Sequence, residues 1–212
     1  MTAPAEPCRL IVFARAPVPG AAKTRLIPAL GAAGAARLHR RLVTHALAAA
    51  CAAAPGRVEL WCAPNARHPF FAECARRFGV ALFAQRGADL GERMHAAMLA
   101  GGSASGPGAC SVLIGSDIPD LSPDYLRDAI ASLERHQVVL GPAEDGGYVL
   151  IGLQRPAPRL FAGIAWGGPT VLAVTRERIA TLRLSCFELP ALWDLDRPED
   201  LARLGGKGPG SD

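Results

Sequence analysis

Residues 10–26 read LIVFARAPVPGAAKTRL and combine an apolar run, a stiff turn and a group of cations. The apolar run has the length and β-branched content of a buried strand. Two prolines and Gly20 then force a turn, and Lys23 and Arg25 precede an Ala-rich segment that favours a helix. The pattern predicts that Arg15, Lys23 and Arg25 gather at the carboxyl end of the strand, where α/β sheets bind ligands and loop N–H groups bind phosphate.

The spacing of this loop differs from that of the Walker A motif, so it does not predict a P-loop. The alternative interpretation is a surface loop whose cations are only solvated. Both interpretations stay open on the loop alone, because short motifs match by chance.

Segments with strand and helix character alternate along the rest of the chain. Predicted strands cover 57–62, 80–84, 111–115, 137–140, 148–153 and 185–189, and predicted helices cover 31–54, 68–78, 90–98, 122–133, 169–182 and 197–204. This alternation predicts an α/β protein with a mostly parallel sheet covered by helices on both faces. With no linker in the middle, we expect one domain over residues 1–204 and a disordered Gly-rich tail over 205–212.

Composition narrows the classes of protein to be considered. The net charge of +4 is scattered, without a basic stripe, so nucleic acid is not an expected partner. No signal peptide and no apolar stretch of membrane-spanning length is visible, which predicts a soluble cytoplasmic protein without membrane contact. The six cysteines form no C-x-x-C pair, and we expect them to be reduced. The oligomeric state cannot be read from these features.

Acidic residues follow several of the predicted strands. Asp117 comes directly after one strand, Asp145 lies in the loop after another, and Asp194 and Asp196 occur late in the chain. Because the carboxyl ends of parallel strands share one edge, these carboxylates are expected to face the Lys23–Arg25 loop. Carboxylates opposite phosphate-binding cations predict a Mg²⁺ or Mn²⁺ site that bridges protein and phosphate oxygens.

Structural alternatives exist for some of these acids. Asp89 with Glu92, and Asp196 with Glu199, have the spacing of helix caps. Asp117 is followed by Ile118-Pro119, which disfavours a helix start, so it is the strongest metal candidate.

Two further patterns bear on the site. Gly146-Gly147 fits either a tight turn between strands or a close approach of the backbone to a ligand. The five histidines show no shared register and no acidic partner, and we interpret each of them as a surface or core residue.

Six segments in order resemble the bacterial DUF2064 family, a glycosyltransferase-like group with members labelled as arsenosugar-biosynthesis glycosyltransferases. They are spread over residues 10–204 and read FARAPVPGAAKTRL, QRGADLGERM, LIGSDIPDL, GPAEDGGYVLIGL, IAWGGPTVL and LWDLDRPEDL. The resemblance implies the GT-A fold of the nucleotide-diphospho-sugar transferases, with three α/β/α layers. It also implies a relationship to molybdenum-cofactor guanylyltransferases and 2-phospho-L-lactate guanylyltransferase.

The resemblance also implies roles for individual residues. A first set belongs to the phosphate loop or lies near the nucleotide: Arg15, Gly20, Lys23, Arg25, Gln85, Gly87, Asp89 and Arg93. Asp117 takes the metal-aspartate position and Asp196 the second ligand position, with Asp194 as its alternative. Asp145, Gly146, Gly147 and Tyr148 would line the acceptor side.

Three functional hypotheses follow. The first is a metal-dependent transferase acting on a nucleotide-activated sugar and a small-molecule acceptor, with Lys23, Arg25 and Asp117 as the residues that act on the diphosphate. The second is a nucleotidylyltransferase that uses an NTP and releases pyrophosphate, because paired cations suit a triphosphate. The third is a nucleotide-binding module that has lost its chemistry.

Overall fold

The computed structural model describes residues 8–100 and 110–204. Its strands are β1 (Arg9–Arg15), β2 (Val58–Ala63), β3 (Ala81–Ala84), β4 (Ser111–Ile114), β5 (Val138–Pro142), β6 (Tyr148–Leu153) and β7 (Cys186–Glu188). Its α-helices are α1 (Ile27–Ala53), α2 (Pro69–Phe78), α3 (Leu90–Leu99), α4 (Pro123–Ser132), α5 (Val171–Thr181) and α6 (Leu201–Leu204). Every segment predicted as a strand or a helix forms one, although several ends shift by a few residues.

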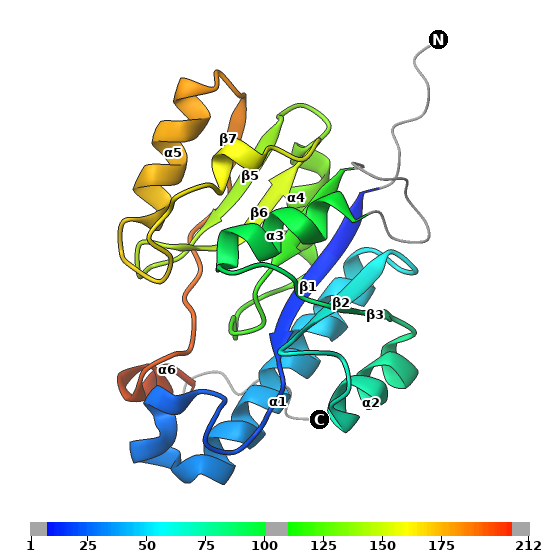
Figure 1. The fold of residues 1–212 in the computed structure, drawn as a ribbon, viewed down its shortest axis with the longest axis vertical. Coiled ribbons are helices and arrows are strands. Elements are labelled where there is room, and N and C mark those ends of the chain that lie inside the picture. The colour runs from blue at the N-terminus through cyan, green and yellow to red at the C-terminus, as the bar shows by residue number, and fades with distance from the viewer. Residues whose placement is uncertain (1–7, 101–109, 205–212) are drawn as a thin grey trace.

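The strands form one mostly parallel sheet in the order β3-β2-β1-β4-β6-β5-β7 (Figure 1). Strand β1 pairs in parallel with both β2 and β4, and only β6, among the described strands, runs antiparallel to its neighbours. The carboxyl ends of β1, β4 and β5 therefore point to the same edge. The loops that follow these strands carry Lys23 and Arg25, Asp117 and Asp145, so the topology brings these residues to one edge as the sequence predicts.

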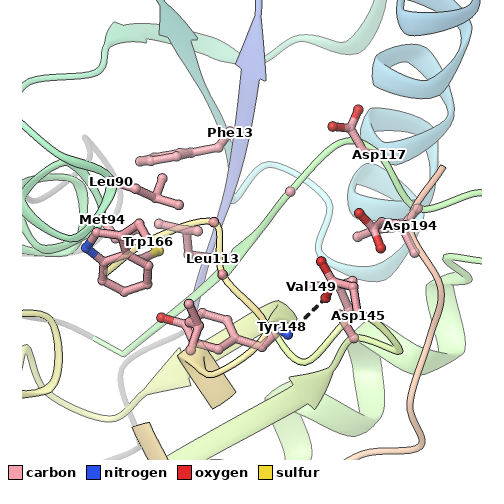
Figure 2. A pocket seen from close by; sticks show the side chains of 17 residues that line it. Phe13, Leu90, Met94, Leu113, Asp117, Asp145, Tyr148, Val149, Trp166 and Asp194 are labelled. Carbon is pink, nitrogen blue, oxygen red and sulfur yellow. Dashed lines mark hydrogen bonds between the residues drawn. The ribbon is translucent and has the colours of Figure 1, made fainter. Parts of the chain in front are cut away.

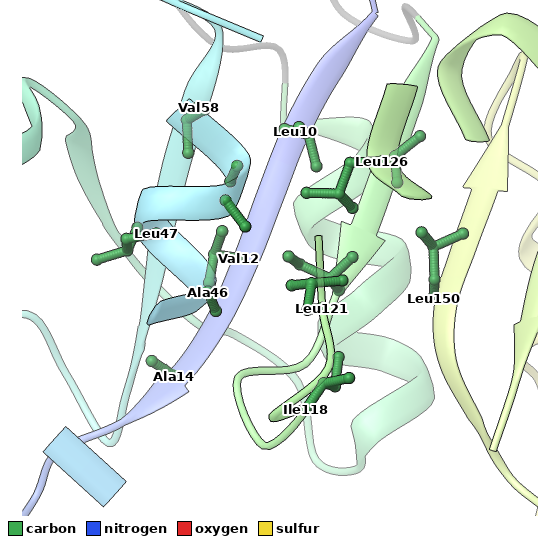
Figure 3. Packing of buried hydrophobic residues seen from close by; sticks show 14 of the residues in the cluster. Leu10, Val12, Ala14, Ala46, Leu47, Val58, Ile118, Leu121, Leu126 and Leu150 are labelled. Carbon is green, nitrogen blue, oxygen red and sulfur yellow. The ribbon is translucent and has the colours of Figure 1, made fainter. Parts of the chain in front are cut away.

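Helices cover both faces of the sheet, which confirms the predicted α/β architecture and its three layers (Figure 1). On one face, α1, α2 and α4 pack against alternate strand residues such as Leu10, Val12 and Leu150 (Figure 3). On the other face, α3 and α5 pack against Ile11, Phe13 and their neighbours. Successive β1 side chains thus point into two different cores, which explains why this strand is an unbroken apolar run.

Local signals explain where several helices begin. Ser122 accepts a hydrogen bond from the Tyr125 N–H at 3.1 Å, and Pro123 occupies the first turn of α4, as predicted. Asp89 caps α3 by accepting from the Glu92 N–H at 2.8 Å. Helix α1 is interrupted at Gly31, whose φ of 68° is the left-handed conformation that glycine adopts at little cost.

A third apolar cluster fixes the segment that precedes α6. Trp193 and Leu195 are buried against Leu38 and Leu42 of α1 and against Leu26 in the turn before that helix. The segment also runs beside the loop after β5, where Leu192 and Ala143 form a parallel bridge. Asp194 and Asp196, which alternate with these buried residues, are thereby carried to the edge that holds the cationic loop.

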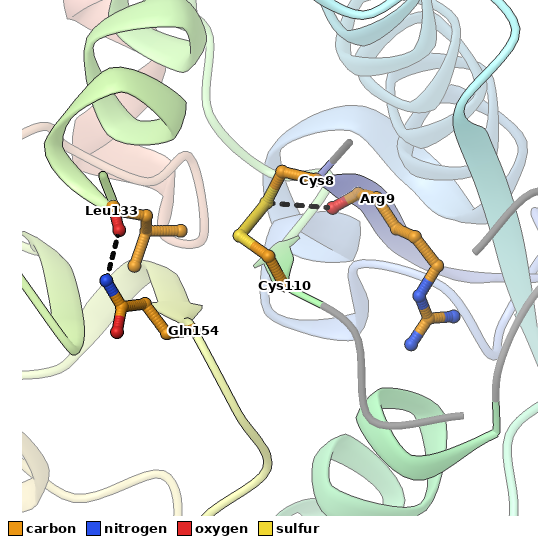
Figure 4. The surroundings of a disulfide bond; sticks show 5 residues. All are labelled: Cys8, Arg9, Cys110, Leu133 and Gln154. Atoms are coloured by element: carbon orange, nitrogen blue, oxygen red, sulfur yellow. Dashed lines mark hydrogen bonds between the residues drawn. A yellow bond between two sulfur atoms is a disulfide. The ribbon is translucent and has the colours of Figure 1, made fainter. Parts of the chain in front are cut away.

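The expectation that all cysteines are reduced is wrong for two of them. Cys8 and Cys110 form a disulfide, with Cα atoms 4.6 Å apart although they are separated by 102 residues in sequence (Figure 4). The reason is the sheet register: Arg9 lies opposite Ser111, so the residues before them are neighbours at the amino ends of β1 and β4. Cys51, Cys62, Cys74 and Cys186 are free.

One expectation lies outside the described residues: the disordered tail over 205–212. Within the described ranges, none of the helices combines the length and the apolar character needed to cross a membrane.

Candidate functional site

The cationic loop after β1 is held in a conformation that is costly for its central residue. Lys23 has φ 50° and ψ 46°, a left-handed conformation that a non-glycine residue adopts only when its surroundings impose it. Its ammonium donates a hydrogen bond to the Leu195 carbonyl, and its side chain is only 3% exposed. The loop is therefore ordered around Lys23, which contradicts the alternative of a merely solvated cation.

Lys23 lies between two of the predicted metal ligands. Its Nζ is 2.9 Å from Asp117 Oδ2 and 3.7 Å from Asp196 Oδ1. Arg25 pairs with the other oxygen of Asp196. A hydrogen bond of 2.8 Å from the Leu195 N–H to the Asp117 carbonyl joins the two acidic segments directly. Two cations and two carboxylates, from three distant parts of the chain, thus form one cluster at the edge of the sheet.

Asp117 is kept ionised by its neighbours. Burial alone would raise the pKa of this carboxyl, but the nearby Lys23 ammonium and the adjacent His39 imidazole lower that pKa to about 2. His39 also contacts the Arg15 carbonyl through Nε2, at 2.9 Å. Interpreting His39 as lacking an acidic partner was therefore wrong: its Nδ1 lies 3.4 Å from Asp117 Oδ1. No local sequence signal reveals this contact, because α1 brings together residues 78 positions apart.

Asp194 lies in a different electrostatic environment from Asp117 and Asp196. Burial raises the pKa of its carboxyl, and the negative charge of Asp145 raises it further. Both side chains line the same pocket and point toward it (Figure 2). The four predicted acids thus separate into a pair bound to cations, Asp117 and Asp196, and a pair that repel each other, Asp145 and Asp194.

The loop Asp145–Gly147 is a tight turn between β5 and β6, one of the two alternatives that the sequence left open. The Gly147 N–H donates to Asp145 Oδ1 at 2.9 Å, and Ala143 and Gly147 close the turn. Gly146 has φ 89°, and a Cβ atom there would lie 2.1 Å from the Pro169 carbonyl oxygen. The close approach that requires glycine is therefore made by the chain's own backbone, which fastens this turn to the segment before α5.

The helix-cap alternative for Asp196 is wrong. The backbone N–H groups of Asp196 and Arg197 donate to Asp200 Oδ2, at 2.9 and 2.7 Å. Because Asp200 supplies the cap, the Asp196 carboxylate is left to pair with Lys23 and Arg25.

The residues predicted near the nucleotide base have local contacts as well. Gln85 Nε2 donates to the Trp61 carbonyl at 2.8 Å, and Arg93 Nε donates to the Gly87 carbonyl at 3.0 Å. Asp89 caps α3, as its spacing to Glu92 suggested. Arg15, the last residue of β1, and Gly20, in the loop that follows it, are exposed. These six residues surround the carboxyl ends of β1, β2 and β3, beside the cluster at Lys23 but outside it.

Two adjoining pockets open at this edge. The first, here called the aromatic pocket, has a volume of about 300 Å³ and an apolar wall formed by Phe13, Leu90, Met94, Leu113, Tyr148 and Trp166 (Figure 2). Asp117, Asp145 and Asp194 line its opposite side. The second, the charged pocket, has about 350 Å³ and is lined by Arg25, Asp196, Arg197 and Arg203 among others. The pockets share Asp145, Asp194, Gly167 and Gly168.

The cluster meets the basic requirements of a divalent-cation site. Asp117 Oδ1 is buried 3.4 Å from His39 Nδ1 and makes no hydrogen bond of good geometry, so its capacity to accept is not satisfied within the protein. Across the described ranges, however, no three His, Cys, Asp or Glu side chains are close enough to hold a metal together. Mg²⁺ needs only one or two carboxylates when phosphates and water supply its other ligands. Asp117 and Asp196 therefore fit a cation that arrives with a nucleotide, not a permanent protein cage.

Comparisons with known proteins agree with the fold. The model of the family described as "Uncharacterized protein conserved in bacteria (DUF2064)" matches residues 46–168. A structure from Desulfovibrio desulfuricans, described as a "putative nucleotide-diphospho-sugar transferase", is 33% identical and has a TM-score of 0.79, covering 97% of this chain and 90% of its own. No curated protein matches the sequence.

More distant structures share only the fold. The inositol-1-phosphate CTP transferase of T. maritima is 13% identical, with a TM-score of 0.61 and coverage of 96% of this chain and 98% of its own. Rv0371c of Mycobacterium tuberculosis in complex with manganese is 16% identical, with a TM-score of 0.55 and coverage of 94% and 99%. The family match and the 33% identical relative show that this chain belongs to the DUF2064 family, with the fold of the nucleotide-diphospho-sugar transferases.

Proposed function

We propose that this protein is a Mg²⁺- or Mn²⁺-dependent transferase that acts on a nucleotide-activated sugar and a small-molecule acceptor. The observation that carries the proposal is the buried Lys23 ammonium, paired with Asp117 and Asp196 at the ligand-binding edge of this fold. A buried ammonium with three donors, beside carboxylates that open into a pocket, can exchange a carboxylate partner for a phosphate oxygen.

In this proposal the diphosphate lies over the cluster, where Lys23 and Arg25 bind its oxygens and stabilise the charge of the leaving group. Asp117 and Asp196 would hold the divalent cation, which neutralises phosphate charge when it is bound. The 2.8 Å hydrogen bond between Leu195 and Asp117 keeps the two acidic segments at a fixed separation. Positioning and electrostatic stabilisation would supply the rate enhancement, without a covalent nucleophile.

The nucleoside then extends toward the carboxyl ends of β1, β2 and β3, where Arg15, Gly20, Gln85, Gly87, Asp89 and Arg93 lie. The acceptor approaches from the side of Asp145, Gly146 and Gly147. The aromatic pocket joins the two directions, because residues of α3 and of the loop after β5 both line it.

The second candidate is a nucleotidylyltransferase that uses an NTP and releases pyrophosphate. The placement of two cations, Lys23 and Arg25, on one short loop favours it, because a triphosphate carries more charge than a diphosphate. The T. maritima relative of the same fold, named as a CTP transferase, supports the same candidate.

The test is a thermal-shift series with nucleoside triphosphates and nucleotide sugars, each with and without Mg²⁺ or Mn²⁺. A ligand at about 100 times its dissociation constant stabilises the folded state by about 2.7 kcal/mol, which is readily visible. We expect one nucleotide sugar to give a shift that requires the metal. The Asp117→Asn variant should lose the shift, and Asp128→Asn, an exposed acid on α4, is the matched control.

Phosphorus NMR of the slow reaction with water then separates the candidates. Release of a nucleoside diphosphate supports sugar transfer, and release of pyrophosphate with a nucleoside monophosphate supports nucleotidyl transfer. Binding without turnover of any nucleotide would favour a module that has lost its chemistry. A shift that is absent with every nucleotide, or unchanged in Asp117→Asn, would contradict the proposal.

A further inference from the structure

The aromatic pocket has a lining that is unusually uniform in charge. Its charged side chains, among the described residues, are the carboxylates Asp117, Asp145 and Asp194, without a lysine, arginine or histidine. The positive groups of the site lie elsewhere: Lys23 is 3% exposed behind Asp117, and Arg25 lines the charged pocket. A row of carboxylates thus separates the cations from the aromatic pocket.

The opposite wall of the pocket is apolar and aromatic. Tyr148 and Trp166 meet edge to face, with ring centroids 6.3 Å apart and an interplanar angle of 89°. Leu90 and Met94 of α3 continue this wall toward Phe13 (Figure 2). Burial of apolar surface is favourable here, and the faces of aromatic rings also attract cations.

These two walls select against anions. A phosphate or carboxylate in the pocket would lie close to the three Asp carboxylates, and like charges at such short range repel each other more strongly near a protein surface than in bulk water. Apart from a metal ion held by Asp117, the lining of the pocket offers this anion no positive partner. A neutral apolar group meets no such penalty, and a cation would gain from both walls.

We propose that the aromatic pocket binds the acceptor, and that this acceptor carries its hydroxyl or amino group on an apolar body that is neutral or cationic and bears no phosphate or carboxylate. The inference rests on the proposed function, because it assigns the phosphates of the donor to the Lys23 cluster. It adds the chemical class of the second substrate, which the fold does not specify.

Three probes with the same hydroxyethyl arm and a tetrahedral head test this class. Choline is cationic, 3,3-dimethylbutan-1-ol is its neutral isostere, and 2-hydroxyethanesulfonate is anionic. Dissociation constants from saturation-transfer NMR titrations of the full chain should place choline and the neutral alcohol at least about tenfold tighter than the anion. Equal or tighter binding of the anion would overturn the inference, as would failure of both other probes to bind.

Variants locate the binding. Asp145→Asn retains an oxygen that can accept the Gly147 N–H, and it should reduce the preference for choline over the neutral alcohol. Trp166→Leu should weaken both of these probes by about tenfold, with Trp166→Phe in between, and circular dichroism checks that each variant is folded. Unchanged binding in folded Trp166→Leu and Asp145→Asn would place the probes elsewhere and overturn the inference.

The outcome can be separated from that of the proposed function. If nucleotides produce no thermal shift while the probes bind in the expected order, the proposed transfer fails and the selectivity of the pocket stands. If a nucleotide sugar binds and the anionic probe is preferred, the transfer stands and the acceptor class is wrong.

Discussion

Two buried ion pairs lie at opposite ends of β1, and they differ in what surrounds them. At the amino end, Arg9 is 2% exposed and binds both oxygens of Glu59, at 3.1 and 3.0 Å. Its other terminal nitrogen donates to the Ala97 and Met98 carbonyls at the end of α3, and Trp61 donates to Glu59. At the carboxyl end, Lys23 is equally buried, but its partners Asp117 and Asp196 are 40% and 35% exposed.

This difference separates a structural pair from one that can act on a ligand. Glu59 is surrounded by protein donors, and Arg9 binds carbonyls that a helix end leaves unpaired, so exchange of partners would cost both hydrogen bonds and solvation. Asp117 and Asp196 open into pockets, and one Asp117 oxygen lacks a hydrogen bond. The first pair fixes the far end of α3, whose first residues line the aromatic pocket, and the second is the one that binds a substrate in the proposed function.

The largest expected loss of stability is at the Arg9–Glu59 pair, which is closed to solvent. Glu59→Gln leaves the Arg9 guanidinium buried without a counter-ion, so we expect a loss of about 3–5 kcal/mol in the free energy of unfolding. Urea denaturation measures it, with Glu73→Gln as the control because Glu73 pairs with Arg40 at the surface. A loss below about 1 kcal/mol would show that the amino-terminal pair is not closed to solvent.

A smaller loss of stability is expected at Lys23, whose partners Asp117 and Asp196 are open to solvent. Lys23→Met removes the cation, but water can solvate the half-exposed carboxylates, so we expect a loss of about 1–2 kcal/mol. Nucleotide binding should fall much more than stability does. Calorimetry of the donor identified by the thermal-shift series measures the affinity, and an affinity that stays within twofold of the wild-type value would remove Lys23 from the phosphate site.

Acidification should destabilise the protein by protonating Asp117, which weakens the ion pair with Lys23. The pKa of Asp117 is lowered to about 2 in the folded protein, so its stabilising effect is complete above about pH 4 and is lost as the pH falls through about 2. Because the side chain is 40% exposed, we expect this contribution to stay below about 1 kcal/mol. Between about pH 4 and 2, the free energy of unfolding should fall more steeply for the wild-type protein than for Asp117→Asn. If the two plots of free energy against pH are parallel, the lowered pKa of Asp117 is wrong.

Arg25 is expected to give the smallest change in stability. Its side chain is 63% exposed, so Arg25→Ala should alter the free energy of unfolding by less than about 0.5 kcal/mol, although it pairs with Asp196. In the proposed function the same change weakens the binding of the nucleotide sugar through its diphosphate. Urea denaturation and calorimetry together test this, and a large loss of stability would show that Arg25 belongs to the fold and not to the site.

Much of the fold could be predicted from the sequence. The apolar run of β1, the Ser122-Pro123 helix start and the alternation of segments are local signals, and each acts over a few residues. The site was predicted in part for the same reason: an acid that follows a strand, such as Asp117, must lie at one edge of a parallel sheet. The helix-cap alternative for Asp196 failed because Asp200, a nearby competitor, makes the cap instead.

The sequence alone determined the architecture and the residue types brought to its ligand-binding edge, because periodicity, turns and caps depend on neighbours along the chain. Only the tertiary structure decided which groups meet. Its packing placed His39 against Asp117, fastened Gly146 to Pro169, joined Cys8 to Cys110 and brought Asp194 close to Asp145. These contacts join distant segments through sheet register and side-chain packing, for which a single sequence contains no local pattern.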